Sequence, residues 1–184
     1  MQFQTKKTSR IALLGVFTAL AFILGFIESL IPPFTGIPGV KAGFANIVTM
    51  TALFLLDKNS ASGEYRPTLT GFLCTLGIST VRILLGGITY NGMSASIYGL
   101  TGAFFSLTVM FLLGRTRLFS VTAVSIAGGV THNLAQLLLA VLMLGDAVIY
   151  YLPMLLISGL AAGLVIGIIS AVLIRRLAPL SLPI

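Results

Sequence analysis

The sequence predicts an all-α integral membrane protein with six transmembrane helices in a single membrane domain. Of its 184 residues, 57% are hydrophobic and only 8% are charged, and the mean hydropathy is +1.09. The apolar residues form runs near the length of about 20 that crosses the hydrocarbon core of a bilayer as a helix. Short polar or Gly/Pro-rich segments separate these runs. These observations together exclude a soluble domain.

The ends of the apolar runs define the elements. We expect helices at about residues 11–30, 42–56, 67–85, 94–113, 118–144 and 148–174. Lys6, Lys7 and Arg10 precede the first run, as in a signal peptide. That run is too long for one and lacks a small-residue cleavage site, so we expect a retained helix. The second run, of about 15 residues, is short for a full span.

The basic residues predict the orientation in the membrane. Six helices place both termini on one side, and nine of the 11 Lys and Arg residues fall there: Lys6, Lys7, Arg10, Lys58, Arg66, Arg115, Arg117, Arg175 and Arg176. The positive-inside rule makes that side cytoplasmic. A net charge of +7 could also favour nucleic acid. Because these cations lie between apolar runs rather than in one patch, we expect no nucleic-acid partner.

Polar residues interrupt the apolar run from residue 118 to 144. His132 and Gln136 are four residues apart and share one helical face, and Gly128 and Gly129 clear space one turn earlier. Unpartnered polar groups are costly in lipid, so these side chains should face a protein interior or a cavity. A hydrogen-bonded clamp between helices and a ligand site both account for them, and the neighbouring Asn133 belongs to the same pattern.

Three charged residues have no topological role: Glu28, Lys41 and Arg82. All three fall toward the external side, where a cavity shared with His132 is the simplest account. Glu28 could instead neutralise one of the cations, and Lys41 could extend to the lipid headgroups. Arg82 suits a carboxylate or phosphate ligand, because a guanidinium presents its N–H donors in a fixed fork.

Neutral polar residues near these charges complete the candidate site. Asn46, Tyr90 and Asn91 could add hydrogen bonds to a ligand, or they could serve as caps and turn formers. The candidate substrate-binding residues are therefore Glu28, Lys41, Asn46, Arg82, Tyr90, Asn91, His132, Asn133 and Gln136.

Small residues mark two faces where helices can approach closely. On the first helix, Gly15 and Ala19 are either packed within the protein or serve as a docking face for a separate membrane subunit. On the last helix there is a longer stripe, for which close packing against a neighbouring helix is a sufficient explanation: Gly159, Gly163, Gly167 and Ala171.

The sequence lacks the motifs of several enzyme classes. It has no P-loop, no Cys/His metal spacing, and no pair of neighbouring aspartates for magnesium and pyrophosphate among its four acidic residues. We therefore expect no enzyme activity, no metal and no cofactor. Any ATP-driven step must be powered by another subunit.

Three segments carry a resemblance to a known family: residues 37–46 (IPGVKAGFAN), 82–84 (RIL) and 132–136 (HNLAQ). In them the chain resembles the Gx transporter family, which has also been labelled heptaprenyl diphosphate synthase component I. Its size and layout are similar to the S components of energy-coupling factor (ECF) transporters.

The resemblance implies a six-helix substrate-binding subunit in a prokaryotic cell membrane, open to the outside. Such a subunit docks onto a transmembrane coupling subunit that carries two ATP-binding subunits. Gly15 and Ala19 would correspond to the docking motif of the first helix, where the usual alanine pair is here a glycine and an alanine.

The residues leave two other functions open. One is an accessory membrane protein of isoprenoid or quinone metabolism beside a separate synthase. The other is an ion-coupled secondary transporter that uses Glu28 and His132. Lys41 and Arg82 favour an anionic or carboxylate-bearing small molecule as the substrate, and the resemblance adds a vitamin-like or isoprenoid-related compound.

Overall fold

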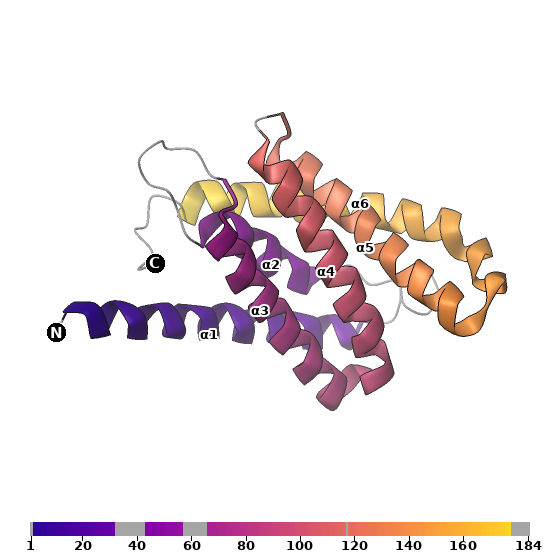
Figure 1. Cartoon of the computed structure of the whole chain (residues 1–184), viewed down its shortest axis with the longest axis horizontal. Coiled ribbons are helices and arrows are strands. Elements are labelled where there is room, and N and C mark those ends of the chain that lie inside the picture. The colour runs from indigo at the N-terminus through magenta and orange to yellow at the C-terminus, as the bar shows by residue number, and fades with distance from the viewer. Residues whose placement is uncertain (1, 32–42, 57–65, 117, 178–184) are drawn as a thin grey trace.

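The computed structural model describes residues 2–31, 43–56, 66–116 and 118–177. In them the chain forms a bundle of α-helices with two shorter helical segments and no strand (Figure 1). The elements in chain order are α1 (Gln2–Ser29), α2 (Phe44–Leu55), α3 (Leu69–Gly86), the π-helical turn η1 (Gly87–Asn91), α4 (Met93–Arg115), α5 (Val121–Leu144), the 3-10 helix η2 (Asp146–Tyr151) and α6 (Leu152–Leu177). The predicted all-α class is confirmed.

Five stretches of the described chain are long and apolar enough to cross a membrane: Thr8–Ser29, Leu69–Asn91, Met93–Arg115, Val121–Leu144 and Asp146–Leu177. They make the chain a multi-pass membrane protein. The remaining helix, α2, has only 12 residues, which is too few to span the hydrocarbon core. The six predicted α-helices are thus present; five of them are long enough to span the hydrocarbon core by themselves, and α2 is not.

Two predicted boundaries also change. The first helix begins at Gln2 rather than near residue 11, because polar residues outside the hydrocarbon can continue a helix without an apolar face. The third helix was expected to end near residue 85. The helix continues as η1 and stops at Gly92, whose φ of 83° suits glycine.

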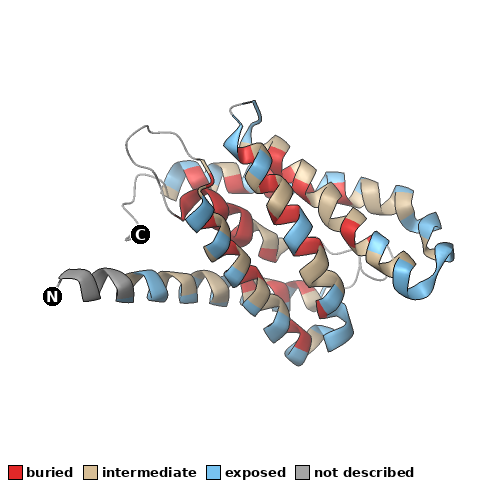
Figure 2. Cartoon of the chain, viewed as in Figure 1, coloured by how far each residue is buried: buried red, intermediate tan, exposed pale blue. Residues whose placement is uncertain are grey.

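The shortest helix forms the centre of the bundle. Nine of the 12 residues of α2 are buried, and α2 packs against α1, α3 and α6 (Figure 2). Four of its side chains, Met50, Leu53, Phe54 and Leu55, belong to the main apolar core. The surrounding helices add Leu107, Met110, Val124, Ile166 and Ile174. A helix that is apolar nearly all round is expected in such an interior position.

Helices α5 and α6 form a hairpin whose backbones touch. A methyl group added at Gly129 would lie 2.5 Å from the carbonyl oxygen of Gly159, and one added at Gly163 would lie 2.7 Å from the Cα of Ile126. A methyl group at Gly167 would lie 2.8 Å from the Cα of Thr122. The close packing predicted for the small-residue stripe of the last helix is thus confirmed.

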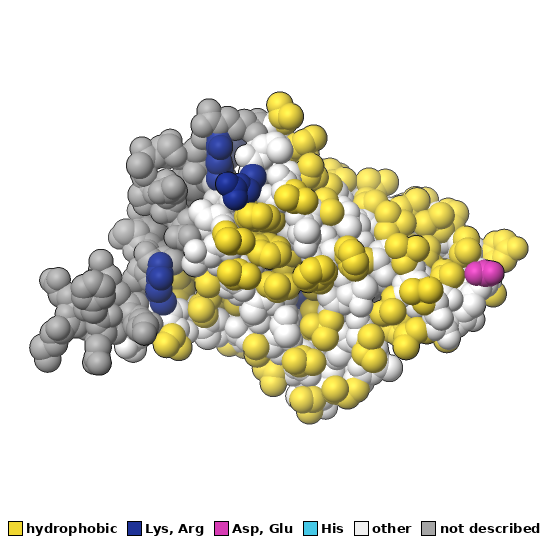
Figure 3. Space-filling model, viewed as in Figure 1, with side chains coloured by type: hydrophobic (Ala, Val, Ile, Leu, Met, Phe, Trp, Pro, Cys, Tyr) yellow, Lys and Arg dark blue, Asp and Glu magenta, His cyan; other side chains and the backbone are white. Residues whose placement is uncertain are grey.

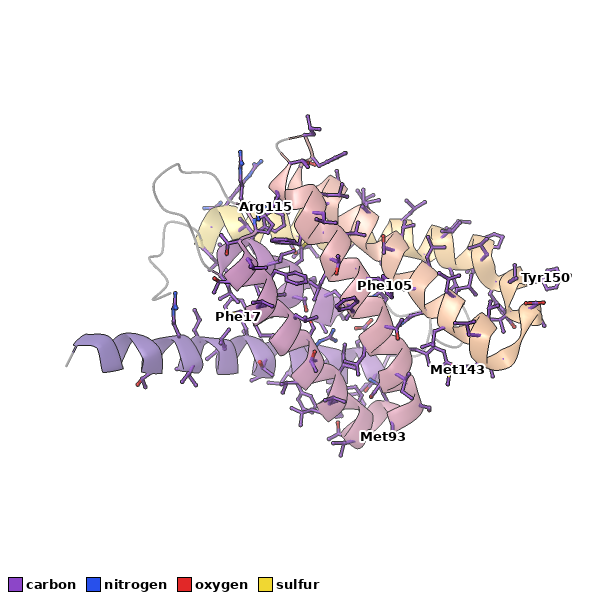
Figure 4. All side chains as sticks on the ribbon, viewed as in Figure 1. Phe17, Met93, Phe105, Arg115, Met143 and Tyr150 are labelled. Carbon is purple, nitrogen blue, oxygen red and sulfur yellow. The ribbon has the colours of Figure 1, made fainter. Side chains whose placement is uncertain are left out.

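The outer surface is largely apolar. Figure 3 shows hydrophobic side chains over most of the visible face, with Lys and Arg side chains gathered toward one end. Arg115 and Tyr150 lie toward opposite ends of the bundle (Figure 4). The start of α1 and the end of α6 lie toward the same end (Figure 1). This distribution suits a bundle surrounded by lipid.

The contact between α5 and α6 gives a test of the fold. Gly163→Ala should lower the thermal midpoint in detergent, corresponding to a loss of about 1–3 kcal/mol, because the new methyl group meets backbone that cannot move aside cheaply. Gly77→Ala is the matched control, since nothing lies within 4 Å of a methyl group there. Equal midpoints for the two variants would contradict the packing described.

Candidate functional site

A cavity of about 570 Å³ lies among the helices. Polar and charged side chains from α1, α2, α3, η1 and α5 line one part of it. They include eight of the nine predicted site residues: Glu28, Asn46, Arg82, Tyr90, Asn91, His132, Asn133 and Gln136. The ninth, Lys41, lies outside the described residues. Residues far apart in the sequence therefore converge on one cavity, and their role in binding remains a prediction.

Glu28 connects α1 to the start of α2. Its two carboxylate oxygens accept hydrogen bonds from the backbone N–H groups of Gly43 and Phe44, the second at 3.1 Å. These N–H groups belong to the first turn of α2 and its N-cap, where a helix has no internal acceptors. A carboxylate also suits the positive end of the helix dipole. Glu28 thus caps α2, and no ion pair joins it to Arg82 in the part of the chain described here.

Arg82 lies in the cavity wall with few partners. Its Nη2 donates to the side-chain oxygen of Asn46 at 3.2 Å. Its Nε is buried and has no hydrogen-bond partner among the described residues. A buried guanidinium with an unused donor and no paired carboxylate is costly, and an anionic ligand would supply what is missing.

Tyr90 closes the cavity between α3 and α1. Its ring packs against Phe22 and Phe26, with ring centroids 5.6 and 5.7 Å apart. Its hydroxyl fits against Gly25, where an added methyl group would lie 2.7 Å from that oxygen. The π-helical turn that carries Tyr90 also places Asn91 in the cavity wall. The absence of a side chain at Gly25 makes room for this hydroxyl.

His132 and Gln136 face the cavity from α5. The Nε2 atoms of the two side chains are 3.1 Å apart, so the imidazole and the amide share a hydrogen bond. The imidazole lies against the backbone of α4 at Gly102, where an added methyl group would come within 2.9 Å of three ring atoms. Packing on one side and the amide on the other hold the ring in place.

Asn133 has a different role from its neighbours. Its amide nitrogen donates to the carbonyl oxygen of Leu155 at 2.7 Å and to the Ser158 hydroxyl at 3.1 Å, both on α6. Both N–H groups of the amide are used in this contact. Of the two interpretations of the polar stretch on helix five, the interhelical clamp fits Asn133, whereas His132 and Gln136 face the cavity.

Much of the remaining cavity wall is apolar and was missed in the sequence analysis. Its apolar residues along α5, η2 and α6 include Leu137, Ala140, Leu144, Val148, Leu155 and Ala162, and Tyr151 and Ser158 lie among them. Leu137, Ala140 and Leu144 follow Gln136 and Asn133 at helical spacing, and this periodicity was the available signal. The cavity therefore has a polar end and an apolar end, an arrangement typical of small-molecule sites.

A smaller cavity of about 40 Å³ continues from the polar end. It shares Arg82, Asn46 and His132 with the main cavity and lies one to two turns deeper along α3, α4 and α5. Serine hydroxyls line it, from Ser79, Ser106 and Ser125. Ser79 Oγ is buried and, within the described chain, has no hydrogen-bond partner.

The predicted docking residues lie outside the cavity. Gly15 and Ala19 are exposed on α1, and nothing lies within 4 Å of a methyl group added at Gly15. Large apolar side chains flank them on the same exposed surface, among them Val16, Leu20 and Ile23. The packing interpretation of this pair within the chain is therefore not realised, and the face is free for lipid or a partner.

The fold and the site together define a multi-pass helical membrane protein with an internal, partly polar cavity. The chain belongs to the family described as heptaprenyl diphosphate synthase component I, whose model matches residues 17–63 and 66–173. This is the family that the sequence motifs indicated. No curated protein and no solved structure matches the chain significantly.

The role of Glu28 as a cap can be tested against the ion-pair interpretation. Glu28→Gln should destabilise the protein by about 1–3 kcal/mol, because an amide replaces one of two acceptors for backbone N–H groups. The Glu28→Gln/Arg82→Gln double variant should recover little of this, since the two side chains do not neutralise each other directly. Thermal unfolding in detergent measures both. Near-complete recovery of stability in the double variant would support the ion-pair interpretation instead.

Proposed function

We propose that this chain is the substrate-binding membrane subunit, or S component, of an ECF-type importer. In this role it captures a small anionic molecule from outside and resides in the cytoplasmic membrane with both termini inside. The observation that carries the proposal is the cavity, in which Arg82 presents an unused buried donor beside Asn46, Tyr90, His132 and Gln136. A binding subunit needs a preformed pocket with a few placed polar groups, and this cavity has that form.

The energy for import must come from partners. The sequence holds no P-loop or other ATP-binding motif. The proposal therefore requires a transmembrane coupling subunit and two ATP-binding subunits. The exposed face of α1 around Gly15 and Ala19 supports a docking role, because small residues let a second helix approach closely in lipid.

The family description favours a second candidate, an accessory membrane protein of a prenyl diphosphate synthase. The scarcity of acidic residues opposes catalysis by this chain itself. Among the described residues Glu28 is the one acidic side chain in the cavity wall, and its carboxylate already caps α2. The same use of Glu28 weakens the secondary-transporter alternative, because a proton carrier at that position would have to release the start of α2.

Uptake into proteoliposomes separates these functions. Native mass spectrometry of the purified protein first identifies a ligand that co-purifies with it. Uptake of that ligand should then require the coupling subunit, both ATP-binding subunits and ATP. Uptake by this chain alone, driven by a proton or sodium gradient, would refute the proposal. Stable co-purification with a prenyl synthase in place of the coupling subunit would favour the second candidate.

The docking face gives a direct variant test. Gly15→Leu/Ala19→Leu should leave the protein folded and able to bind its ligand, but should abolish co-purification with the coupling subunit, because bulky side chains keep the backbones apart. Ala161→Leu, at an exposed alanine of α6, is the matched control and should co-purify normally. Unchanged co-purification of the double variant would remove this face from the interface.

The anion-binding role of Arg82 gives a second test. Arg82→Gln should leave the ligand-free protein nearly as stable as the original. It should remove the ligand-induced stabilisation, which is about 3–4 kcal/mol for a saturating ligand. His132→Ala should also lose ligand binding, through the loss of a ring that lines the cavity. Thermal shift with and without the co-purified ligand measures both. A full ligand response in Arg82→Gln would exclude Arg82 from the site.

A further inference from the structure

We propose that the head group of the ligand is a single carboxylate, which enters the smaller, serine-lined cavity and binds Arg82 Nε and Ser79 Oγ. The apolar body of the ligand lies along the wall formed by α5 and α6. From the described lining we expect a diphosphate to bind this site less tightly than a carboxylate. The inference rests on the proposed function only in taking the cavity as a ligand site.

The first step concerns unused donors. Arg82 Nε and Ser79 Oγ are buried and have no hydrogen-bond partner among the described residues, and both residues line the smaller cavity. They belong to one helix at three-residue spacing, so they lie on the same face of α3. A buried donor without a partner is costly, and two neighbouring donors match the two oxygens of a carboxylate.

The second step concerns space. The smaller cavity measures about 40 Å³, and a polar cavity of about 10–15 Å³ already admits a water molecule. It therefore accommodates a head group of a few heavy atoms. It adjoins the main cavity, since both are lined by Asn46, Arg82, Gly129, His132 and Ile166. The planar guanidinium of Arg82 can contact an oxygen that has reached the smaller cavity.

The third step concerns charge. Among the described residues that line the two cavities, Glu28 and Arg82 are the only Asp, Glu, Lys or Arg side chains. Their formal charges sum to zero, and Glu28 is held by backbone N–H groups. A carboxylate adds one negative charge beside one guanidinium. A diphosphate adds two or more, which the described part of the wall, with Arg82 as its one cation, does not balance at membrane depth.

The fourth step concerns the body of the ligand. Beyond His132 and Gln136 the main cavity is lined mostly by apolar side chains, Leu137, Ala140, Leu144, Val148 and Leu155, with Tyr151 and Ser158 among them. Such a wall gains by burying hydrocarbon, roughly in proportion to the apolar area removed from water. The two ends of the cavity together therefore select an amphipathic monocarboxylate over a small hydrophilic anion.

Head-group series with a constant body test this inference. The protein is reconstituted in lipid nanodiscs, and its thermal midpoint and binding isotherms are measured with geranic acid, geraniol, geranyl monophosphate and geranyl diphosphate. Octanoate, octanol and octyl phosphate repeat the comparison with a linear body, and acetate and chloride represent anions without one. The alcohols report partition of the body into lipid or cavity without a charged head.

The carboxylates should bind at least about tenfold more tightly than the alcohols and the phosphates with the same body, which is the size expected for hydrogen bonds to a charged group. Equal or tighter binding of the diphosphate would overturn the inference, as would the absence of any response to both carboxylates. A response to acetate or chloride as large as that to octanoate would overturn the amphipathic assignment.

Variants locate the head group. Ser79→Ala should weaken binding of the carboxylates about tenfold and leave binding of the alcohols unchanged. Thr75→Val is the matched control, because Thr75 is also a buried, unpartnered hydroxyl of α3 but lines neither cavity. Equal weakening in both variants would show that the effect is structural and would overturn the assignment of Ser79.

The two proposals fail separately. Selective carboxylate binding by the isolated chain without ATP-dependent uptake in the presence of the partner subunits would refute the import function and retain the carboxylate site. ATP-dependent import of a diphosphate by the assembled complex would retain the import function and refute the carboxylate site.

Discussion

The start of α2 inside the protein is the constraint on which the rest of the structure depends. A helix of 12 residues in a membrane protein leaves its first N–H groups away from bulk water, where each needs an acceptor. The carboxylate of Glu28 provides two acceptors from α1. The main cavity lies beside the start of α2, since Glu28, Gly43 and Asn46 line it. The residues that cap α2 therefore also form part of the cavity wall.

The use of Glu28 as a cap determines the electrostatics of the site. With both of its oxygens engaged by the backbone, the carboxylate does not pair with Arg82, whose contact in the described chain is the neutral oxygen of Asn46. Within the described residues the guanidinium is thus held by Asn46 and has no counter-ion. A preorganised cation of this kind loses less on binding an anion than one that must first leave an internal partner. The positions of two charges on different helices thereby favour a ligand of one sign.

Much of the fold could be predicted from the sequence, because lipid requires long apolar runs and permits few exceptions. The shortness of the second helix was visible in the length of its apolar run, and the convergence of Arg82 and His132 was visible in their positions as polar residues within apolar runs. The capping role of Glu28 was not, since it depends on which backbone groups lie beside α1 in space. The sequence also did not show that Asn133 bonds to α6 whereas His132 faces the cavity. Adjacent residues point to different neighbours, and only the positions of α4 and α6 show which neighbour each one meets.

The π-helical turn η1 stores a single extra residue, since a π-turn accommodates one more residue than the α-helical turn it replaces. This extra residue determines the direction in which the side chains of η1 point around the helix axis. Removal of one residue from this turn would rotate the following side chains by about 100°, the angle that separates neighbours on an α-helix. Tyr90 would then swing away from Phe22 and Phe26 on α1. An insertion or deletion at this point of the chain would therefore remodel both the wall between α1 and α3 and the part of the cavity that Tyr90 and Asn91 line.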